Sequence, residues 1–105
     1  MSTTDPVLAR YRAAVTELYG DRIERIVLYG SRARGDARWD SDYDVALFIN
    51  NLSSRWGEGL KVADVELAIL DDTGAVVHTQ LFPAGRWREA GSPLMFEIRQ
   101  DGRDL

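Results

Sequence analysis

Residues 26–49 constrain the fold of this chain more than any other stretch of its sequence. An apolar run over residues 25–29 leads into Gly30-Ser31, a short basic segment follows, and a second apolar run covers residues 42–49. Both runs have the length and composition of β-strands, and the first is continuous enough for a central strand covered on both faces. The order therefore predicts two strands joined by a segment that opens with a glycine-serine turn.

Alternation along the second run sorts its side chains onto two faces of the strand. One face carries Tyr43, Val45, Leu47 and Ile49, and the other carries Asp42, Asp44, Ala46 and Phe48. Side chains two residues apart on a strand are rooted about 6–7 Å apart, so Asp42 and Asp44 can converge on a hard cation such as Mg²⁺, which prefers oxygen ligands. Backbone N–H groups at the glycine-serine turn suit a phosphate. Carboxylates facing such a turn predict a nucleotide site.

Length, charge and cysteine content narrow the class of protein. The 105 residues predict a single domain over residues 1–105. The net charge of −4 disfavours non-specific binding to nucleic acid or to anionic membranes, although Arg32, Arg34 and Arg38 supply local positive charge beside the turn. The absence of cysteine excludes disulfides and thiol chemistry. No apolar run approaches membrane-spanning length, and we expect a cytoplasmic protein.

Apolar periodicity and capping residues predict the remaining elements. In chain order we expect a helix from Asp5-Pro6 to Gly20, a strand over 25–29, a turn of helix over 32–35 capped by Ser31, a strand over 42–49, a helix over 60–70, a strand over 75–82 and a helix from Ser92-Pro93 to Gly102. This order predicts an α+β (α/β-like) fold, with a small mixed β-sheet and helices packed on one side.

The segment from Gly30 to Asp44 resembles the signature of the minimal nucleotidyltransferases, the smallest members of the DNA polymerase beta-like nucleotidyltransferase superfamily. The shared pattern is Gly30-Ser31-x-Ala33-Arg34-Gly35, five further residues, and then Ser41-Asp42-x-Asp44. Fixed residue types in this order and spacing argue against a chance match. The length of the chain and the order of its elements also resemble a free-standing domain of that superfamily, so the resemblance implies a nucleotidyltransferase fold.

The resemblance implies a role for each matching position. It assigns nucleotide binding to Gly30, Ser31, Arg32, Arg34 and Ser41. Asp42 and Asp44 would be catalytic and would hold one or two Mg²⁺ ions, a pair of ions only when the nucleotide phosphates supply further ligands. The implied reaction transfers a nucleoside monophosphate, AMP from ATP, to a hydroxyl group and releases pyrophosphate.

Active enzymes of the superfamily use a third carboxylate from the next strand, and residues 76–82 of this chain contain none. Alternation places either His78 and Gln80 or Thr79 and Leu81 toward the site. His78, the only histidine, is a candidate catalytic base, although a neutral imidazole is a poorer ligand for Mg²⁺ than oxygen.

Two functions stay open at this point. The first is a magnesium-dependent nucleotidyltransferase that acts on a hydroxyl of a partner protein or a small molecule. Free-standing domains of this kind resemble antitoxins of bacterial two-gene modules, so the implied protein partner is a helical toxin. The second is a catalytically weak or inactive module that binds nucleotide or neutralises a partner by contact, which the missing third carboxylate favours.

Trp39, just before the acidic strand, either flanks a base or caps the core, and the core is the expected place.

Overall fold

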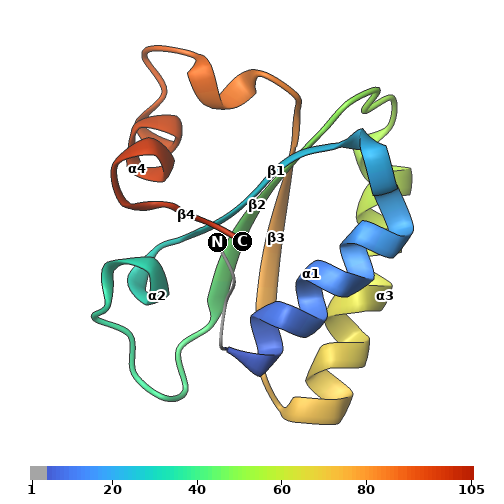
Figure 1. Ribbon diagram of the computed structural model, residues 1–105, viewed down its shortest axis with the longest axis vertical. Coiled ribbons are helices and arrows are strands. Elements are labelled where there is room, and N and C mark those ends of the chain that lie inside the picture. The colour runs from blue at the N-terminus through green and yellow to red at the C-terminus, as the bar shows by residue number, and fades with distance from the viewer. Residues whose placement is uncertain (1–4) are drawn as a thin grey trace.

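A computed structural model describes residues 5–105, and within them four strands form one mixed sheet (Figure 1). The strands are β1 (Ile23–Tyr29), β2 (Tyr43–Ile49), β3 (Val77–Pro83) and β4 (Arg103–Asp104), in the spatial order β3-β2-β1-β4. β1 is antiparallel to both of its neighbours, whereas β2 and β3 are parallel. A parallel pair needs a crossover, which the helix between β2 and β3 supplies. The predicted α+β class with a small mixed sheet is confirmed.

Helices α1 (Pro6–Tyr19) and α4 (Pro93–Asp101) begin where the sequence predicts. The Asp5 carboxylate accepts a hydrogen bond at 2.9 Å from the backbone N–H two residues ahead, and the Ser92 hydroxyl accepts one at 3.2 Å from the N–H three residues ahead. Proline follows each cap, where its missing N–H leaves no donor unsatisfied. None of the helices within residues 5–105 is long and apolar enough to cross a membrane.

Helices α2 and α3 differ from their predicted starts. α3 (Arg55–Thr73) begins a full turn earlier than predicted, because the Ser54 hydroxyl accepts a hydrogen bond from a backbone N–H of its first turn at 3.1 Å. This cap offsets the low helix propensity of the two glycines that suggested a loop there. In α2 (Ser31–Arg34) the prediction of Ser31 as the cap is wrong. Gly30 occupies the cap position, and none of the described side chains caps this helix.

Two features of the sheet extend beyond the prediction. β1 begins at Ile23 instead of residue 25, and the two-residue β4 was not predicted because so short a strand has no periodicity to detect. β4 pairs with β1, and the Arg25 guanidinium forms three hydrogen bonds with the Asp104 carboxylate at 2.7, 2.9 and 3.1 Å. These contacts tie the end of the described chain to the sheet.

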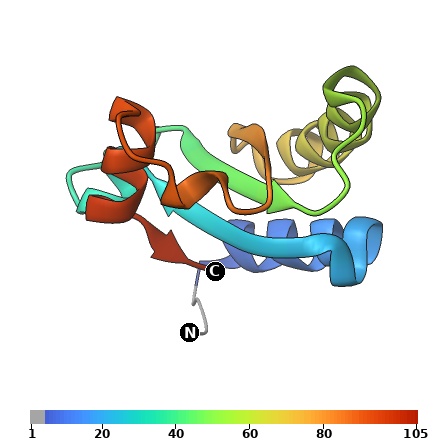
Figure 2. The ribbon, with the colours of Figure 1, turned by 90° about the horizontal axis from the view of Figure 1, so that it is seen from above.

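The two faces of the sheet carry different helices. The side chains of β2 alternate as predicted: Tyr43, Val45, Leu47 and Ile49 join a core with α1 and α3, while Ala46 and Phe48 join a core with α4. Figure 2 shows α1 and α4 on opposite sides of the strands. The prediction that the helices pack on one side of the sheet therefore holds for α1 and α3, which lie side by side in Figure 1. It does not hold for α4. α4 lies on the other face because Met95 and Ile98 pack there against the apolar side chains of the sheet.

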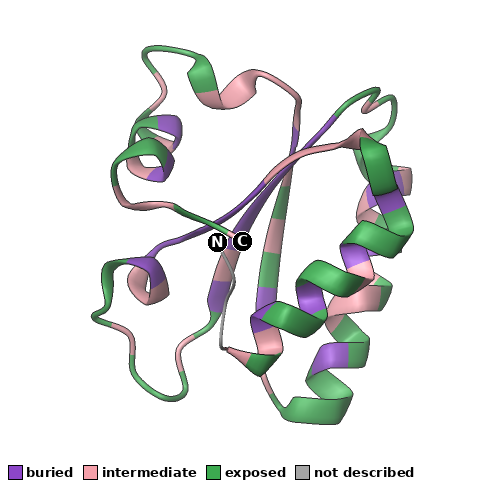
Figure 3. Cartoon of the chain, viewed as in Figure 1, coloured by how far each residue is buried: buried purple, intermediate pink, exposed green. Residues whose placement is uncertain are grey.

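Burial separates the inner strands from the outer surfaces of the helices (Figure 3). β1 and β2 are the most deeply buried elements. On α3, Val62 and Ile69 are buried, whereas Leu60 and Leu67, which the sequence places on the same broad apolar face, are more than half exposed. The expected core position of Trp39 is wrong, because its side chain is 90% exposed.

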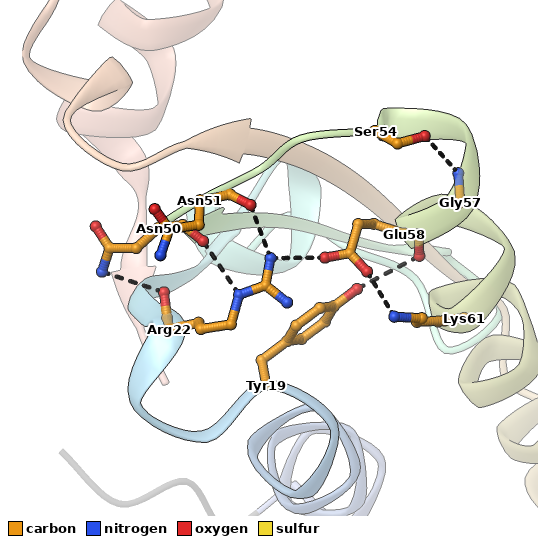
Figure 4. A network of polar contacts seen from close by, with 8 residues as sticks. All are labelled: Tyr19, Arg22, Asn50, Asn51, Ser54, Gly57, Glu58 and Lys61. Carbon is orange, nitrogen blue, oxygen red and sulfur yellow. Dashed lines mark hydrogen bonds and ion pairs between the residues drawn. The ribbon is translucent and has the colours of Figure 1, made fainter.

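A polar network joins the end of α1 to the start of α3, beyond the C-terminal end of β2 (Figure 4). The Arg22 guanidinium donates to the Glu58 carboxylate at 2.8 Å and to the Asn51 carbonyl at 3.0 Å. Lys61 reaches the same carboxylate at 3.0 Å, and the Tyr19 hydroxyl donates to the Glu58 carbonyl at 3.4 Å. Glu58 is buried and carries two cationic partners, so its charge is compensated where the two helices meet.

Candidate active site

The predicted site residues meet at the end of the sheet where β1 stops and β2 begins. Antiparallel pairing sets Tyr29, the last residue of β1, opposite Asp44. Parallel pairing of β2 with β3 sets Asp44 beside His78. Residues from three separate parts of the chain thus share one edge of the sheet, and Gly30 follows directly after β1.

Gly30 lies against the carboxylate of Asp44. Its backbone has a φ of +75° and a ψ of −156°, a conformation that side chains with a Cβ rarely adopt. A Cβ built on Gly30 would lie 2.6 Å from Asp44 Oδ2, well inside van der Waals contact. Glycine is therefore required at position 30 for two reasons, the backbone conformation of the turn and the close approach of the backbone to the Asp44 carboxylate.

The environment of Asp44 raises the pKa of its carboxyl group above the ordinary value. Burial of the half-exposed carboxyl raises its pKa; the nearby His78 and Arg34 lower it, and the carboxylate of Asp42 raises it. The net direction is upward. Two carboxylates on one strand face repel each other, and a cation bound between them would relieve that repulsion.

β3 brings His78 to the site, which settles the alternation left open by the sequence. His78 Nε2 lies 3.0 Å from Asp42 Oδ2 in an exposed pair. Thr79 belongs to the other face, where its hydroxyl and the Tyr11 hydroxyl are 2.7 Å apart, and Leu81 packs against the core on that same face. His78 and Gln80 are therefore the β3 side chains on the face that holds the aspartates.

The two arginines of α2 have different partners. Arg34 forms ion pairs with Asp36 at 3.3 Å and with Glu97 of α4 at 3.2 Å. Arg32 donates to the Ser41 carbonyl at 2.9 Å and to the Trp39 carbonyl at 3.2 Å, and its guanidinium stacks 3.8 Å from the centre of the Tyr43 ring. Arg32 thus braces the loop before β2, whereas Arg34 borders the carboxylates.

The loop that carries Ser41 is closed by its own hydrogen bonds. The Ser41 hydroxyl accepts from the Arg38 backbone N–H at 2.8 Å, and the Ser41 N–H donates to the Arg38 carbonyl at 3.0 Å. This turn delivers the chain to Asp42 at the mouth of the site. Of the residues expected to bind nucleotide, Gly30 and Arg34 lie near Asp44, and Ser31 directly follows Gly30. Arg32 and Ser41 instead hold the loop.

Two residues near the site were missed by the sequence reasoning. Burial raises the pKa of the Tyr29 hydroxyl, and the negative charges of Asp44 and Glu97 raise it as well. Tyr29 is therefore close enough to both carboxylates to feel their charges. Alternation in the first strand and the position of Tyr29 beside Gly30 offered a signal for the tyrosine. Glu97 lies on α4 and reaches the site only through the fold, so no local pattern marks it.

Asp42 and Asp44 fit a magnesium ion in kind but supply few ligands. Among residues 5–105 no group of three or more Asp, Glu, His or Cys side chains is placed to hold a metal ion. The two carboxylates offer hard oxygen donors, and Mg²⁺ commonly completes its shell with water and substrate phosphates. The residues therefore fit a metal that binds together with a nucleotide.

A small mixed sheet with a glycine-serine turn facing two carboxylates is the arrangement of a nucleotidyltransferase domain. The family model of the polymerase beta nucleotidyltransferases matches residues 15–103, so the chain belongs to this family. No curated protein matches the chain.

Solved structures share the fold at low sequence identity. An inferred minimal nucleotidyltransferase is 22% identical, with a TM-score of 0.61, covering 99% of this chain and 100% of that one. A toxin–antitoxin solved with AMP-PNP is 18% identical, with a TM-score of 0.54, covering 90% of this chain and 68% of that one. A mutant of the toxin–antitoxin MntA-HpeT is 14% identical, with a TM-score of 0.58, covering 89% and 68%.

Proposed function

We propose that this chain is a magnesium-dependent nucleotidyltransferase that transfers AMP from ATP to a hydroxyl group of a partner protein. The observation that carries the proposal is the close contact between the Gly30 backbone and the Asp44 carboxylate, which leaves no room for a Cβ at residue 30. A phosphate bound at the Gly30-Ser31 backbone would lie next to the group that binds the metal. Membership of the polymerase beta nucleotidyltransferase family supports the same reaction class.

The roles follow from position. Gly30 and Ser31 would bind phosphate oxygens, and Arg34 would exchange its carboxylate partners for the phosphates. Asp42 and Asp44 would hold Mg²⁺, which when bound neutralises phosphate charge and polarises the phosphoryl group. The acceptor oxygen forms a bond to the α-phosphorus, the bond from that phosphorus to the bridging oxygen breaks, and pyrophosphate leaves. His78 lies where it can accept the hydroxyl proton.

The exposed face of α3 supports a protein as the acceptor. Leu67 and Leu70 border a groove of about 300 Å³ that also touches Val76 and reaches His78. A helix of a partner protein with an apolar face fits such a groove, and the groove would lead its hydroxyl to the aspartates. We propose a helical toxin as this partner, in line with the toxin–antitoxin structures that share the fold, and the cytoplasm, where ATP is available, as the compartment.

A second function is favoured by one observation. The β3 residue aligned with Asp44 is His78 and not a carboxylate, so the metal site has two acidic ligands from the protein. A module with the same fold that binds nucleotide, or neutralises its partner by contact without turnover, would retain every other feature of the site.

One assay separates the two functions. The protein is incubated with ATP labelled in the α-phosphate, Mg²⁺ and the product of the neighbouring gene, and label on the partner is measured. We expect labelling that disappears in Asp42→Asn and Asp44→Asn and persists in Asp64→Asn, a matched control on the exposed side of α3. Tight partner binding without label would instead identify the non-catalytic module.

The groove is tested in the same assay with Leu67→Glu. This change places a charge on an exposed leucine, so the fold is expected to persist while labelling of the partner falls. Binding of Mg-ATP by the variant should equal that of the wild type, which separates loss of docking from loss of the nucleotide site.

A further inference from the structure

A pocket of about 310 Å³ opens beside Asp42 on the side of the loop that precedes β2. Its lining includes Trp39, Asp42 and Tyr43 from the loop and the start of β2, and residues 73–76 from the end of α3 and the segment before β3. Such a volume lies at the small end of ligand sites and suits a single ring system with its sugar. The catalytic roles proposed above leave this pocket unused.

Trp39 is held at the mouth of this pocket by an ordered turn. Its carbonyl accepts a hydrogen bond from Arg32, which also binds the Ser41 carbonyl and stacks on Tyr43. Hydrogen bonds between Arg38 and Ser41 hold the residue that precedes Trp39, so the backbone is fixed on both sides of Trp39. The indole is nevertheless 90% exposed. Tryptophan is on average one of the more buried residues, and an indole displayed on a fixed backbone is a stacking surface prepared for a flat ring.

We infer that Trp39 and this pocket hold the planar base of the nucleotide whose phosphates the proposed site binds; the inference rests on the proposed function. Asp42 connects the two regions, because its carboxylate lies 3.0 Å from His78 in the proposed site and the residue also lines the pocket. A nucleotide bound through its phosphates at Asp42 would continue directly into the pocket toward Trp39.

The charges around the pocket favour an uncharged group over a second phosphate. Asp40 and Asp42 both line it, and the negative charge of these residues disfavours a further anion there. The one cation of the lining, Arg32, is already engaged with two carbonyl oxygens and the Tyr43 ring. A base and its ribose carry no charge, and stacking on Trp39 needs none.

The position of the acceptor groove also favours the base. The groove on α3 reaches His78, whereas the pocket reaches Asp42, and these two side chains are 3.0 Å apart. The acceptor and the nucleoside would thus approach the Asp42–His78 pair from different hollows, as a transfer between two substrates requires. An aromatic side chain of the partner on Trp39 is the competing occupant.

Calorimetric titration with Mg-ATP and with magnesium inorganic triphosphate tests the inference. The triphosphate lacks the base, so it reports on the phosphate site alone. We expect Trp39→Ala to weaken ATP binding about tenfold and to leave triphosphate binding unchanged, and Trp39→Phe to retain most of the ATP affinity. Trp56→Ala is the matched control, since Trp56 is 79% exposed on α3 and lines neither hollow; it should bind both ligands as the wild type does.

Three results would overturn the inference. Equal loss of ATP and triphosphate affinity in Trp39→Ala would mean that Trp39 acts by shaping the loop. Unchanged ATP affinity would place the base elsewhere, and a loss of partner binding alone would assign Trp39 to the acceptor protein. If the wild-type protein binds neither ligand, the proposed nucleotide site itself fails and the base pocket fails with it, an outcome distinct from the other three.

Discussion

Replacing Gly30 with alanine tests whether the contact between the turn and Asp44 builds the site. The backbone at Gly30 has a φ of +75° and a ψ of −156°, and holding alanine in such a conformation costs about 1–3 kcal/mol. The new Cβ would also lie 2.6 Å from Asp44 Oδ2, so the carboxylate must move off its preferred rotamer, which adds about 0.5–1.5 kcal/mol. We expect Gly30→Ala to lower the free energy of unfolding by about 2–4 kcal/mol.

Gly20 provides a control that isolates the clash from the backbone cost. Its φ of +53° and ψ of −125° also favour glycine, but beyond its two chain neighbours no described atom lies within 4 Å of a Cβ built there. Urea unfolding should therefore show a smaller loss for Gly20→Ala. A second control places Gly30→Ala in an Asp44→Ala background, where the clashing oxygen is gone and about 1 kcal/mol of the loss should be recovered.

The outcome that refutes this reasoning is specific. If Gly30→Ala costs no more than Gly20→Ala, and costs the same with or without the Asp44 carboxylate, the contact has no energetic role. Calorimetry on the same proteins connects the contact to function, because Gly30→Ala displaces Asp44 and should abolish Mg-ATP binding, while Gly20→Ala should preserve it.

Three other changes test the electrostatics. Burial raises the pKa of Asp44, so its charged form destabilises the folded state above that pKa. Without Mg²⁺, the free energy of unfolding of Asp44→Asn at pH 7 should exceed that of the wild type by about 0.5 kcal/mol. This difference should close as acid protonates the wild-type carboxyl. Burial of the Glu58 carboxyl raises its pKa, but the hydrogen bonds from Lys61 and Arg22 outweigh burial, and the net pKa is lowered. The charged carboxylate therefore stabilises the fold above the unfolded pKa of about 4.3, and this stabilisation is lost as the pH falls. Glu58→Gln should therefore cost about 1 kcal/mol at pH 7 and weaken the acid dependence of thermal unfolding. Glu97→Gln frees Arg34 from one carboxylate, so calorimetry should show Mg-ATP binding strengthened about threefold. Unchanged affinity would exclude competition between Glu97 and the phosphates for Arg34.

The alternation of β2 was readable from the sequence because it depends only on local geometry. Apolar side chains at every second position fixed one face toward α1 and α3, and this placed Asp42 and Asp44 together on the other. The caps at Asp5 and Ser92 were readable for the same reason, since each acts within one turn of helix. Local rules thus predicted that the two carboxylates share a face, and they predicted where two helices begin.

Contacts that depend on the packing of distant elements were not readable. The pairing of His78 with Asp42 requires the register between β2 and β3, which the crossover through α3 sets. Glu97 reaches Arg34 only because α4 packs on the second face of the sheet. Hydrophobicity placed Trp39 in the core, whereas hydrogen bonds from Arg32 to backbone carbonyls, which have no sequence pattern, hold its loop at the surface.

The choice between enzyme and binding module depends on the residue that faces Asp44 from β3. The register puts His78 beside Asp44, on the strand from which the resemblance implies a third carboxylate, and its imidazole lies 3.0 Å from Asp42. If His78 accepts the proton of the acceptor hydroxyl, His78→Asp and His78→Ala should both slow AMP transfer. If the chain is instead limited by a missing metal ligand, His78→Asp supplies an oxygen donor beside Asp44 and should raise transfer and tighten Mg-ATP binding, while His78→Ala changes neither. The two hypotheses thus predict opposite changes in the rate of AMP transfer for His78→Asp, which makes this one substitution decisive. A histidine that only fills the edge of the sheet predicts neither change.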